Sequence, residues 1–307
     1  MSDLHNPIFT DEAAAREHFE ALRWPDGPYC PYCGSFTRVA SLGGQSMGPG
    51  WYHCNDCRRK FTAAVGTIYE RSHLPMSKWL LATHLMCASK KGMSANQLGR
   101  MLGLPYKTAW FMAHRIREAM REVNPGPLGG EGKTVEADET FIGNKKGGRT
   151  NKRGPAHKHK VVSLVERNGR ARSFHVANFG FSNMRKLLVA NVDRKSALMT
   201  DDARHYRGVA KEFAKHESVA HSVDECVRGD AHTNTIEGFY SIFKRGMKGV
   251  YQHCGEQHLH RYLTEFDFRY SNRIALGVED SERANAAVKG AVGRRLTYRQ
   301  PSERPDD

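Results

Sequence analysis

The chain has 307 residues, of which 39% are hydrophobic and 26% charged, and it carries a formal net charge of +14 with a pI near 9.5. This length allows two or three compact units, and no run approaches the ~20 apolar residues that span a bilayer, which excludes an integral membrane protein. The acidic N-terminus has no apolar signal core, so we expect a cytoplasmic protein, and the positive charge favours a polyanionic partner.

The first 66 residues predict a short helix and then a metal-binding unit. Residues 10–22 are typical of a helix with Thr10 as N-cap, which places an N-terminal helix within residues 1–24. Four of the seven cysteines form two C-x₂-C pairs with twenty residues between them: Cys30, Cys33, Cys54 and Cys57. This spacing favours one structural Zn²⁺ over disulfides, because four thiolates complete a tetrahedral site and leave no position for substrate. We therefore predict a zinc ribbon over residues 25–66.

The following segment, residues 67–123, is helical in pattern and resembles a helix-turn-helix. Ser94 is a good N-cap, Gly103 ends one helix and Pro105 opens the next, whose exposed side would read the major groove of DNA. A plain helical hairpin fits the same pattern, and the preceding ribbon and the net charge favour DNA binding. The candidate DNA contacts in the second helix are Tyr106, Lys107, Thr108 and Arg115. Those in the ribbon, where a solvated basic edge is equally consistent, are Arg58, Arg59 and Lys60.

A linker rich in Pro and Gly, residues 124–132, marks the main predicted domain boundary. After it the pattern becomes β-rich, with an Asn168-Gly169 pair that is typical of a type I′ hairpin turn. The expected order over residues 133–275 is a strand at 133–143, a hairpin at 160–179, a helix at 182–192, a strand at 196–202 and helices from about 233. This order predicts an α/β domain with a mixed sheet. Residues 276–307 are expected to form a C-terminal tail that is partly disordered.

Three acidic positions in this domain predict a site for divalent metal. Asp138 lies within the first strand, Asp201 ends a later apolar run, and Glu237 lies in a helix. Glu136 and Glu139 compete with Asp138: on an extended strand Glu136 shares its face and Glu139 takes the other. Sixty-two residues separate the first two and 35 separate the last two. Carboxylates on two strands and a helix could hold two metal ions about 4 Å apart, which suits Mg²⁺ or Mn²⁺. Taken singly, each acid has a structural alternative: a solvated edge strand, a turn, or a helix cap.

The order of the motifs along the chain resembles that of the zinc-ribbon DDE transposases of the insertion-sequence 1595 group. The stretches that carry it are "CPYC…CNDC", "GTIYERSHLPMSKWL", "VEADETFIG", "TDDARHY" and "HTNTIEGFYSIFKRGMKGVY". The resemblance extends from about residue 15 to residue 275. It implies an RNase H-like catalytic domain in which Asp138, Asp201 and Glu237 hold two Mg²⁺ or Mn²⁺ ions. It further implies a bacterial insertion-sequence transposase that binds terminal inverted repeats, cleaves DNA at the 3′ ends and transfers the strand to target DNA.

The same resemblance directs attention to the helix around Glu237 and to a basic arm. Lys244 would position a phosphate, His232 could approach the scissile phosphate, and Asn234 is a neighbouring or substitute metal ligand. Residues 144–160 have seven Lys or Arg and no acid, so this arm would grip DNA, unless it is only a solvated loop. The DNA contacts expected from the arm are Lys145, Lys146, Arg149, Lys152 and Arg153.

Two rival functions remain open on the sequence. One is a DNA-binding regulator with the ribbon and helix-turn-helix but no catalysis, and the other is a two-metal nuclease that acts on branched DNA. Because transposition brings two DNA ends together, we expect a dimer or higher oligomer on double-stranded DNA.

Overall fold

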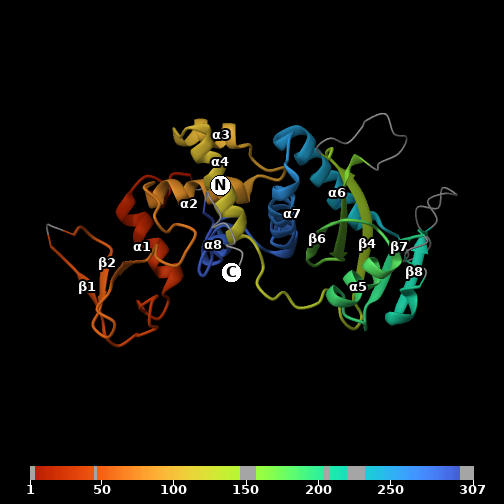
Figure 1. Cartoon of the computed structure of the whole chain (residues 1–307), viewed down its shortest axis with the longest axis horizontal. Helices are drawn as coiled ribbons and strands as arrows, with labels where there is room; N and C mark the ends of the chain where they lie inside the picture. The colour runs from red at the N-terminus through yellow and green to blue at the C-terminus, as the bar shows by residue number, and fades with distance from the viewer. Residues whose placement is uncertain are drawn as a thin grey trace, which may run out of the picture. The chain divides into compact units, whose positions relative to one another are not determined.

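The computed structural model describes residues 4–44, 47–145, 157–203, 206, 208–219 and 232–297 (Figure 1). Its contacts divide the chain into two compact units. The first comprises Met1–Ser89, Met93–Arg121 and Asp280–Asp307, and the second comprises Lys90–Gly92 and Glu122–Glu279. Among the described residues, no helix combines the length and the apolar character that crossing a membrane requires.

The first unit begins with a short 3₁₀ helix, Pro7–Phe9, and the helix α1, Glu12–Arg23. A three-stranded antiparallel sheet follows, made of β1 (Val39–Leu42), β2 (Trp51–Cys54) and β3 (Lys60–Thr62) in that order. The predicted N-cap of α1 was wrong by one residue. Asp11, and not Thr10, accepts a hydrogen bond from the backbone N–H of Ala14 at 2.8 Å. Thr10 instead ends the preceding 3₁₀ helix.

Four further helices complete the first unit: α2 (Met76–Ala88), α3 (Ala95–Leu102), α4 (Tyr106–Ala119) and α8 (Asp280–Lys289). The predicted boundaries of α3 are confirmed, because the Ser94 hydroxyl accepts from the Gln97 N–H and Gly103 takes a left-handed conformation at φ 64°. The expectation of a tail from residue 276 was wrong for the described residues. The helix α8 buries Ala284, Ala287 and Val288 and packs on α2. Small side chains gave this face no strong apolar signal in the sequence.

The second unit is an α/β domain with a five-stranded mixed sheet, as predicted. The strands are β4 (Thr134–Ile142), β5 (His159–Glu166), β6 (Ala171–Val176), β7 (Ala197–Asp201) and β8 (Lys215–Val219). They lie in the order β6-β5-β4-β7-β8, with β5 antiparallel to both of its neighbours and β7 parallel to β4 and β8. The strand β4 is therefore central, so the alternative of a solvated edge strand for Asp138 is wrong.

The hairpin predicted around Asn168-Gly169 forms, but its turn is not the expected type I′. Only Asn168 is left-handed, at φ 55°, whereas a type I′ turn needs positive φ at both central residues. The Gly169 N–H donates to the Glu166 carbonyl at 3.0 Å and closes the turn.

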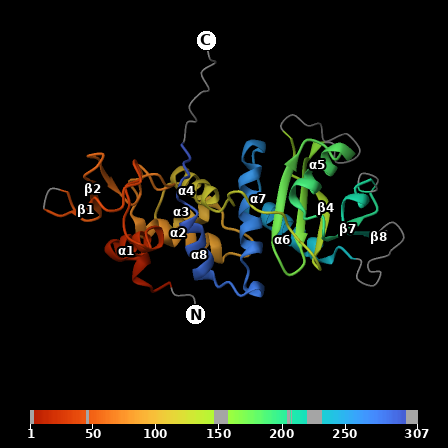
Figure 2. The ribbon, with the colours of Figure 1, turned by 90° about the horizontal axis from the view of Figure 1, so that it is seen from below.

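Helices cover both faces of the large sheet (Figures 1 and 2). The helix α5 (Phe181–Asn191) buries Met184 and Leu188 against Val135, Ala137 and Leu164 on one face. The opposite face packs on α6 (Asn234–Gly246), on a π-helical turn (Met247–Tyr251) and on α7 (Glu256–Ser271). Two short 3₁₀ helices, Ala210–Glu212 and Ile274–Leu276, complete the unit.

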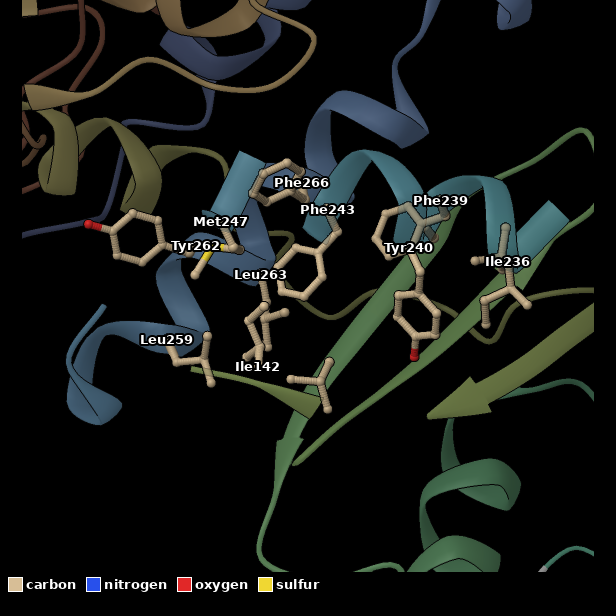
Figure 3. Close-up of a cluster of buried hydrophobic side chains, with 13 residues drawn as sticks. Ile142, Ile236, Phe239, Tyr240, Phe243, Met247, Leu259, Tyr262, Leu263 and Phe266 are labelled. Carbon is tan, nitrogen blue, oxygen red and sulfur yellow. The ribbon is translucent and has the colours of Figure 1, made fainter. Parts of the chain in front are cut away.

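The apolar residues of α6 recur at the i, i+3, i+4, i+7 spacing of one helix face, and that face points into the sheet. Figure 3 shows Ile236, Phe239, Tyr240 and Phe243 directed from α6 toward the strands, with Phe266 of α7 beside Phe243. The Tyr240 hydroxyl donates a hydrogen bond to the backbone carbonyl of Asp138 at 2.7 Å. This contact ties the middle of α6 to the strand that carries Asp138.

The start of α6 is held by a buried carboxylate on β4. The side chain of Glu136 is fully buried, and it accepts from the backbone N–H of Ile236 at 2.9 Å and from Arg167 Nε at 2.7 Å. The same arginine donates through Nη2 to the carbonyl of His232 at 2.9 Å. The first turn of a helix has unpaired N–H groups and a positive partial charge, so a carboxylate there is doubly favourable.

We predict that Glu136→Gln will lower the free energy of unfolding of the second unit by about 3 kcal/mol, because it leaves the guanidinium of Arg167 without its buried partner. Chemical denaturation followed by far-UV circular dichroism measures this loss. The matched control is Glu217→Gln on β8. Glu217 is half-buried and pairs with the exposed Lys215 at the surface, so this substitution should change stability by under about 0.5 kcal/mol. Equal effects of the two substitutions would contradict the role of Glu136.

Candidate metal centres and catalytic site

The four cysteines predicted to bind zinc come together in the first unit. Their sulfur atoms all lie within 4.8 Å of one another, with Cys30 Sγ 3.5 Å from Cys57 Sγ and Cys33 Sγ 3.6 Å from Cys54 Sγ. A tetrahedral zinc with bonds of ~2.3 Å to sulfur separates its ligands by roughly 3.8 Å, so the four thiols fit one ion. His53 is not part of the group, since its Nδ1 lies 3.0 Å from Asn55 Oδ1. The cysteine cluster supports a structural zinc.

In the second unit, Asp138 and Asp201 lie on adjacent strands and on one face of the sheet. Glu136 on β4 is paired with Met199 on β7, so two residues further along each parallel strand Asp138 comes beside Asp201. Carboxylate oxygens of Asp138, Glu139 and Asp201 lie within 4.8 Å of one another. Hard oxygen donors at this separation suit Mg²⁺ or Mn²⁺.

Glu139 is the member of this group that the sequence did not place. Alternation along β4 directs it to the other face, where its Oε2 accepts from the buried Tyr206 hydroxyl at 2.7 Å. Because β7 ends at Asp201, β4 has no strand partner on that side beyond Asp138, and the Glu139 carboxylate approaches the other two around this edge. The sequence offered Glu139 as a competitor of Asp138 and not as a ligand beside it, because strand alternation put it on the other face.

The surroundings of Asp138 favour a cation. Burial raises the pKa of this carboxyl to about 7, and the nearby Glu139 and Asp201 carboxylates also raise it. The backbone N–H of Glu139, which donates to Asp138 Oδ1 at 2.7 Å, and the Lys244 ammonium oppose the rise. A group of acids that share a half-buried site repel one another, and a bound cation would relieve that repulsion.

Glu237, the third predicted ligand, does not belong to the close carboxylate group among the described residues. It lies in the first turn of α6, where its Oε1 accepts from the Thr233 hydroxyl at 3.1 Å. Asn234, Glu237 and Lys244 are all exposed on α6, opposite its buried stripe. Lys244 Nζ lies 5.6 Å from the centre of the Tyr240 ring and near enough to Asp138 to affect its pKa.

His232 lies beside Glu136, just before α6, and its approach to the scissile phosphate stays a prediction. Its Nδ1 lies 3.4 Å from Glu136 Oε1, beside the buried carboxylate that holds the start of α6, and it is not in the carboxylate group of Asp138. This position makes it part of the support of α6.

The residues predicted to contact DNA fall into three sets. Arg58, Arg59, Lys60, Tyr106 and Lys107 are exposed and Thr108 is half-buried. Arg115 is buried, which corrects its prediction as an exposed contact: its Nη2 donates to the Glu70 carbonyl at 2.7 Å, and its guanidinium lies over the rings of Trp79 and Phe111. Lys145 is half-buried, whereas Lys146, Arg149, Lys152 and Arg153 lie outside the described residues.

We predict that Cys54→Ser will release the zinc of the ribbon, because a three-thiolate remnant cannot close the tetrahedral site. Metal analysis of dialysed, reduced protein should show a loss of about one zinc per chain relative to the wild type. Limited proteolysis should then cut within residues 25–66. Cys254→Ser is the control: Cys254 lies outside the group, so this variant should keep the ribbon zinc. Retention of that zinc by Cys54→Ser would contradict the assignment.

The raised pKa of Asp138 predicts that metal affinity depends on pH. Below about pH 7 this carboxyl holds a proton that a cation must displace, so Mn²⁺ should bind more weakly at about pH 6 than at about pH 8, with proton release at the lower pH. Calorimetric titration in two buffers of different ionisation enthalpy measures both effects. Asp138→Asn should abolish the proton release; an affinity independent of pH across this range would refute the prediction.

Comparisons with known proteins agree with this organisation. Two family models match the chain, the transposase zinc-ribbon domain at residues 10–60 and the ISXO2-like transposase domain at residues 127–271. The chain is 28% identical over 277 residues to the uncharacterized protein in transposable element ISH50 of Halobacterium salinarum, which covers 85% of this chain and 91% of that protein.

Two solved structures of low similarity are the Mos1 strand transfer complex and a pre-cleavage Mos1 transpososome. The first is 12% identical with a TM-score of 0.29 and covers 68% of this chain and 73% of that chain. The second is 10% identical with a TM-score of 0.27 and covers 68% of this chain and 74% of that chain. These scores are too low to support an inference. The two family models show that the chain carries, in this order, a zinc-ribbon domain and a transposase domain of the insertion-sequence 1595 type.

Proposed function

We propose that this protein is the transposase of an insertion sequence, which binds the terminal inverted repeats, cleaves DNA at the 3′ ends and joins those ends to target DNA. The observation that carries the proposal is the convergence of the Asp138, Glu139 and Asp201 carboxylates within the matched transposase domain. Carboxylates clustered at the end of β7 repel one another, and a bound divalent cation would offset that repulsion. They favour catalysis over the rival function of a DNA-binding regulator.

The donors of this group fit divalent metal of the Mg²⁺ class. Asp138 and Asp201 would hold the metal from adjacent strands, with Glu139 as a further oxygen donor beside them. Two such ions when bound would supply activation of water and charge stabilisation on the phosphodiester. The protein's own part is to keep the two strands in register, which the β4–β7 pairing does, so that the carboxylates are preorganised for the cations.

The helix α6 would bring the remaining catalytic groups to the sheet. Its exposed stripe of Asn234, Glu237 and Lys244 is fixed relative to Asp138 by two contacts, Glu136 with the Ile236 N–H and the Tyr240 hydroxyl with the Asp138 carbonyl. Glu237 would turn from Thr233 to complete the metal site, and Lys244 would contact a DNA phosphate. A rigid helix anchored at two points can position such groups more closely than a loop.

DNA binding would use the exposed basic residues of the first unit. Arg58, Arg59 and Lys60 follow the last cysteine of the ribbon, and the guanidinium of Arg59 lies 4.8 Å from the centre of the exposed Tyr32 ring. Tyr106 and Lys107 open α4, the candidate recognition helix, and Tyr106 is 53% exposed. Together with the net charge of +14, these groups suit phosphate contacts and base contacts in a DNA groove. Because two ends must be joined, the active form would be a dimer or higher oligomer on DNA.

We predict that Asp138→Asn and Asp201→Asn will each reduce end cleavage and strand joining by at least about a hundredfold, because each removes an anionic metal ligand. Labelled oligonucleotides that carry the element's terminal repeats measure both steps in the presence of Mn²⁺. Asp202→Asn is the matched control, since the exposed Asp202 lies outside the carboxylate group and should retain activity.

The same assay separates the rival functions. Unchanged joining in Asp138→Asn would refute the metal site. Cleavage of branched DNA without joining in the wild type would identify a nuclease, and binding without either reaction would identify a regulator. Comparison of Glu237→Gln with Asn234→Ala then tests the third ligand: loss of activity only in Glu237→Gln would support Glu237, and loss only in Asn234→Ala would replace it.

A further inference from the structure

A second group of metal-binding side chains lies in the second unit, away from the carboxylates of the proposed active site. It consists of His159 at the start of β5, His175 near the end of β6 and Glu256 in the first turn of α7. One donor atom of each lies within 4.8 Å of the others. Asp138 is paired with Ser163, four residues along β5 from His159, so roughly 13 Å of strand separates the two groups.

The distances within this group are those of ligands around an ion. His159 Nδ1 and His175 Nε2 each lie 3.7 Å from the same atom, Glu256 Oε1. This is too long for a hydrogen bond, which spans ~2.7–3.2 Å. Ligands on a tetrahedral zinc with bonds of ~2.0–2.1 Å are separated by roughly 3.4 Å, so shifts of a few tenths of an ångström would seat one ion.

The burial of His159 gives an independent reason for a ligand here. Its side chain is only 4% exposed, and Nδ1 is buried without a hydrogen-bond partner in the described part of the chain. An unsatisfied polar atom in the interior is unfavourable, and coordination of a cation would satisfy it.

We propose that His159, His175 and Glu256 form a binding site for one divalent transition-metal ion of the zinc class. Two imidazoles and one carboxylate are a donor set for Zn²⁺, Co²⁺ or Ni²⁺ and not for Mg²⁺, which prefers oxygen ligands. Three protein ligands leave one coordination position for water or a further donor. The site is separate from the four-cysteine ribbon, which lies in the other unit.

A metal at this position would join three segments that are distant in the sequence. The helix α7 already lies along the edge strand β6, since Asp267 accepts from the Ser173 N–H at 2.7 Å and Ser271 Oγ accepts from the Ala171 N–H at 3.0 Å. The metal would add a third link, between the first turn of α7 and the ends of β5 and β6. It would also fix His159, the first residue of β5.

Metal titration of the full chain tests this site. Reduced protein that retains its ribbon zinc is titrated with Co²⁺ in excess Mg²⁺. The Mg²⁺ occupies the carboxylate group of Asp138, Glu139 and Asp201, so that Co²⁺ does not bind there. We expect the wild type to bind one additional Co²⁺ per chain, with visible ligand-field bands but no sulfur-to-metal charge-transfer band. His175→Gln should reduce this affinity at least about a hundredfold and Glu256→Gln at least about tenfold. Both side chains are partly exposed, so these variants should fold.

The control is His253→Gln, which alters an exposed histidine outside the group and should bind the additional Co²⁺ as the wild type does. Zn²⁺ should raise the melting temperature of the wild type and of this control but not of His175→Gln. The proposal is overturned if the wild type takes up no additional Co²⁺, or if His175→Gln and Glu256→Gln bind it as tightly as the wild type. Neither outcome depends on transposition activity.

Discussion

The catalytic unit depends on the fully buried carboxylate of Glu136. It stands on the central strand β4, two residues from Asp138, and it binds both the Ile236 N–H and Arg167 Nε. The Glu136 carboxylate thus faces the positive N-terminal end of α6 and also pairs with Arg167. Arg167 in turn donates to the His232 carbonyl, just before that helix. Because Glu136 and Asp138 are on one strand, the contact that fixes the helix also fixes it relative to the candidate metal ligand. Tyr240 repeats the arrangement one turn later through the Asp138 carbonyl.

The carboxylates that would bind metal are arranged differently, with like charges close together. Asp138, Glu139 and Asp201 converge where β7 ends, and burial raises the pKa of Asp138 to about 7. Glu136 pairs with an arginine at 2.7 Å, whereas Asp138 accepts from the Glu139 N–H and is flanked by two carboxylates that raise its pKa further. Because these carboxylates repel one another, this point of the sheet favours the binding of a cation. Glu136 and Asp138 lie on the same strand, but their surroundings indicate a structural role for Glu136 and a candidate catalytic role for Asp138.

The edge strand β6 is protected by α7 in place of another strand. Side chains of Asp267 and Ser271 accept from backbone N–H groups that would otherwise be open to pairing with a further chain. The histidine–glutamate group lies at one end of this row, where β6, β5 and the start of α7 meet. The helix thus serves packing through Phe266, edge protection through Asp267 and, under our proposal, metal binding through Glu256.

Features with a short-range signature could be predicted from the sequence alone. Two C-x₂-C pairs placed the four thiols that lie together, the apolar spacing of α6 gave its buried face, and alternation along β4 put Glu136 and Asp138 on one side. Each follows from local geometry, because a turn, a helical period or a strand pleat is set by neighbours in the chain. Tertiary structure decided what depends on distant partners: Arg115 is buried against Glu70, α8 packs on α2 and Glu139 joins the acids through a strand edge. Likewise His159, His175 and Glu256 had no common motif. Their side chains come together because of the register of the sheet and the packing of α7 on it. Both depend on many weak contacts across the whole unit.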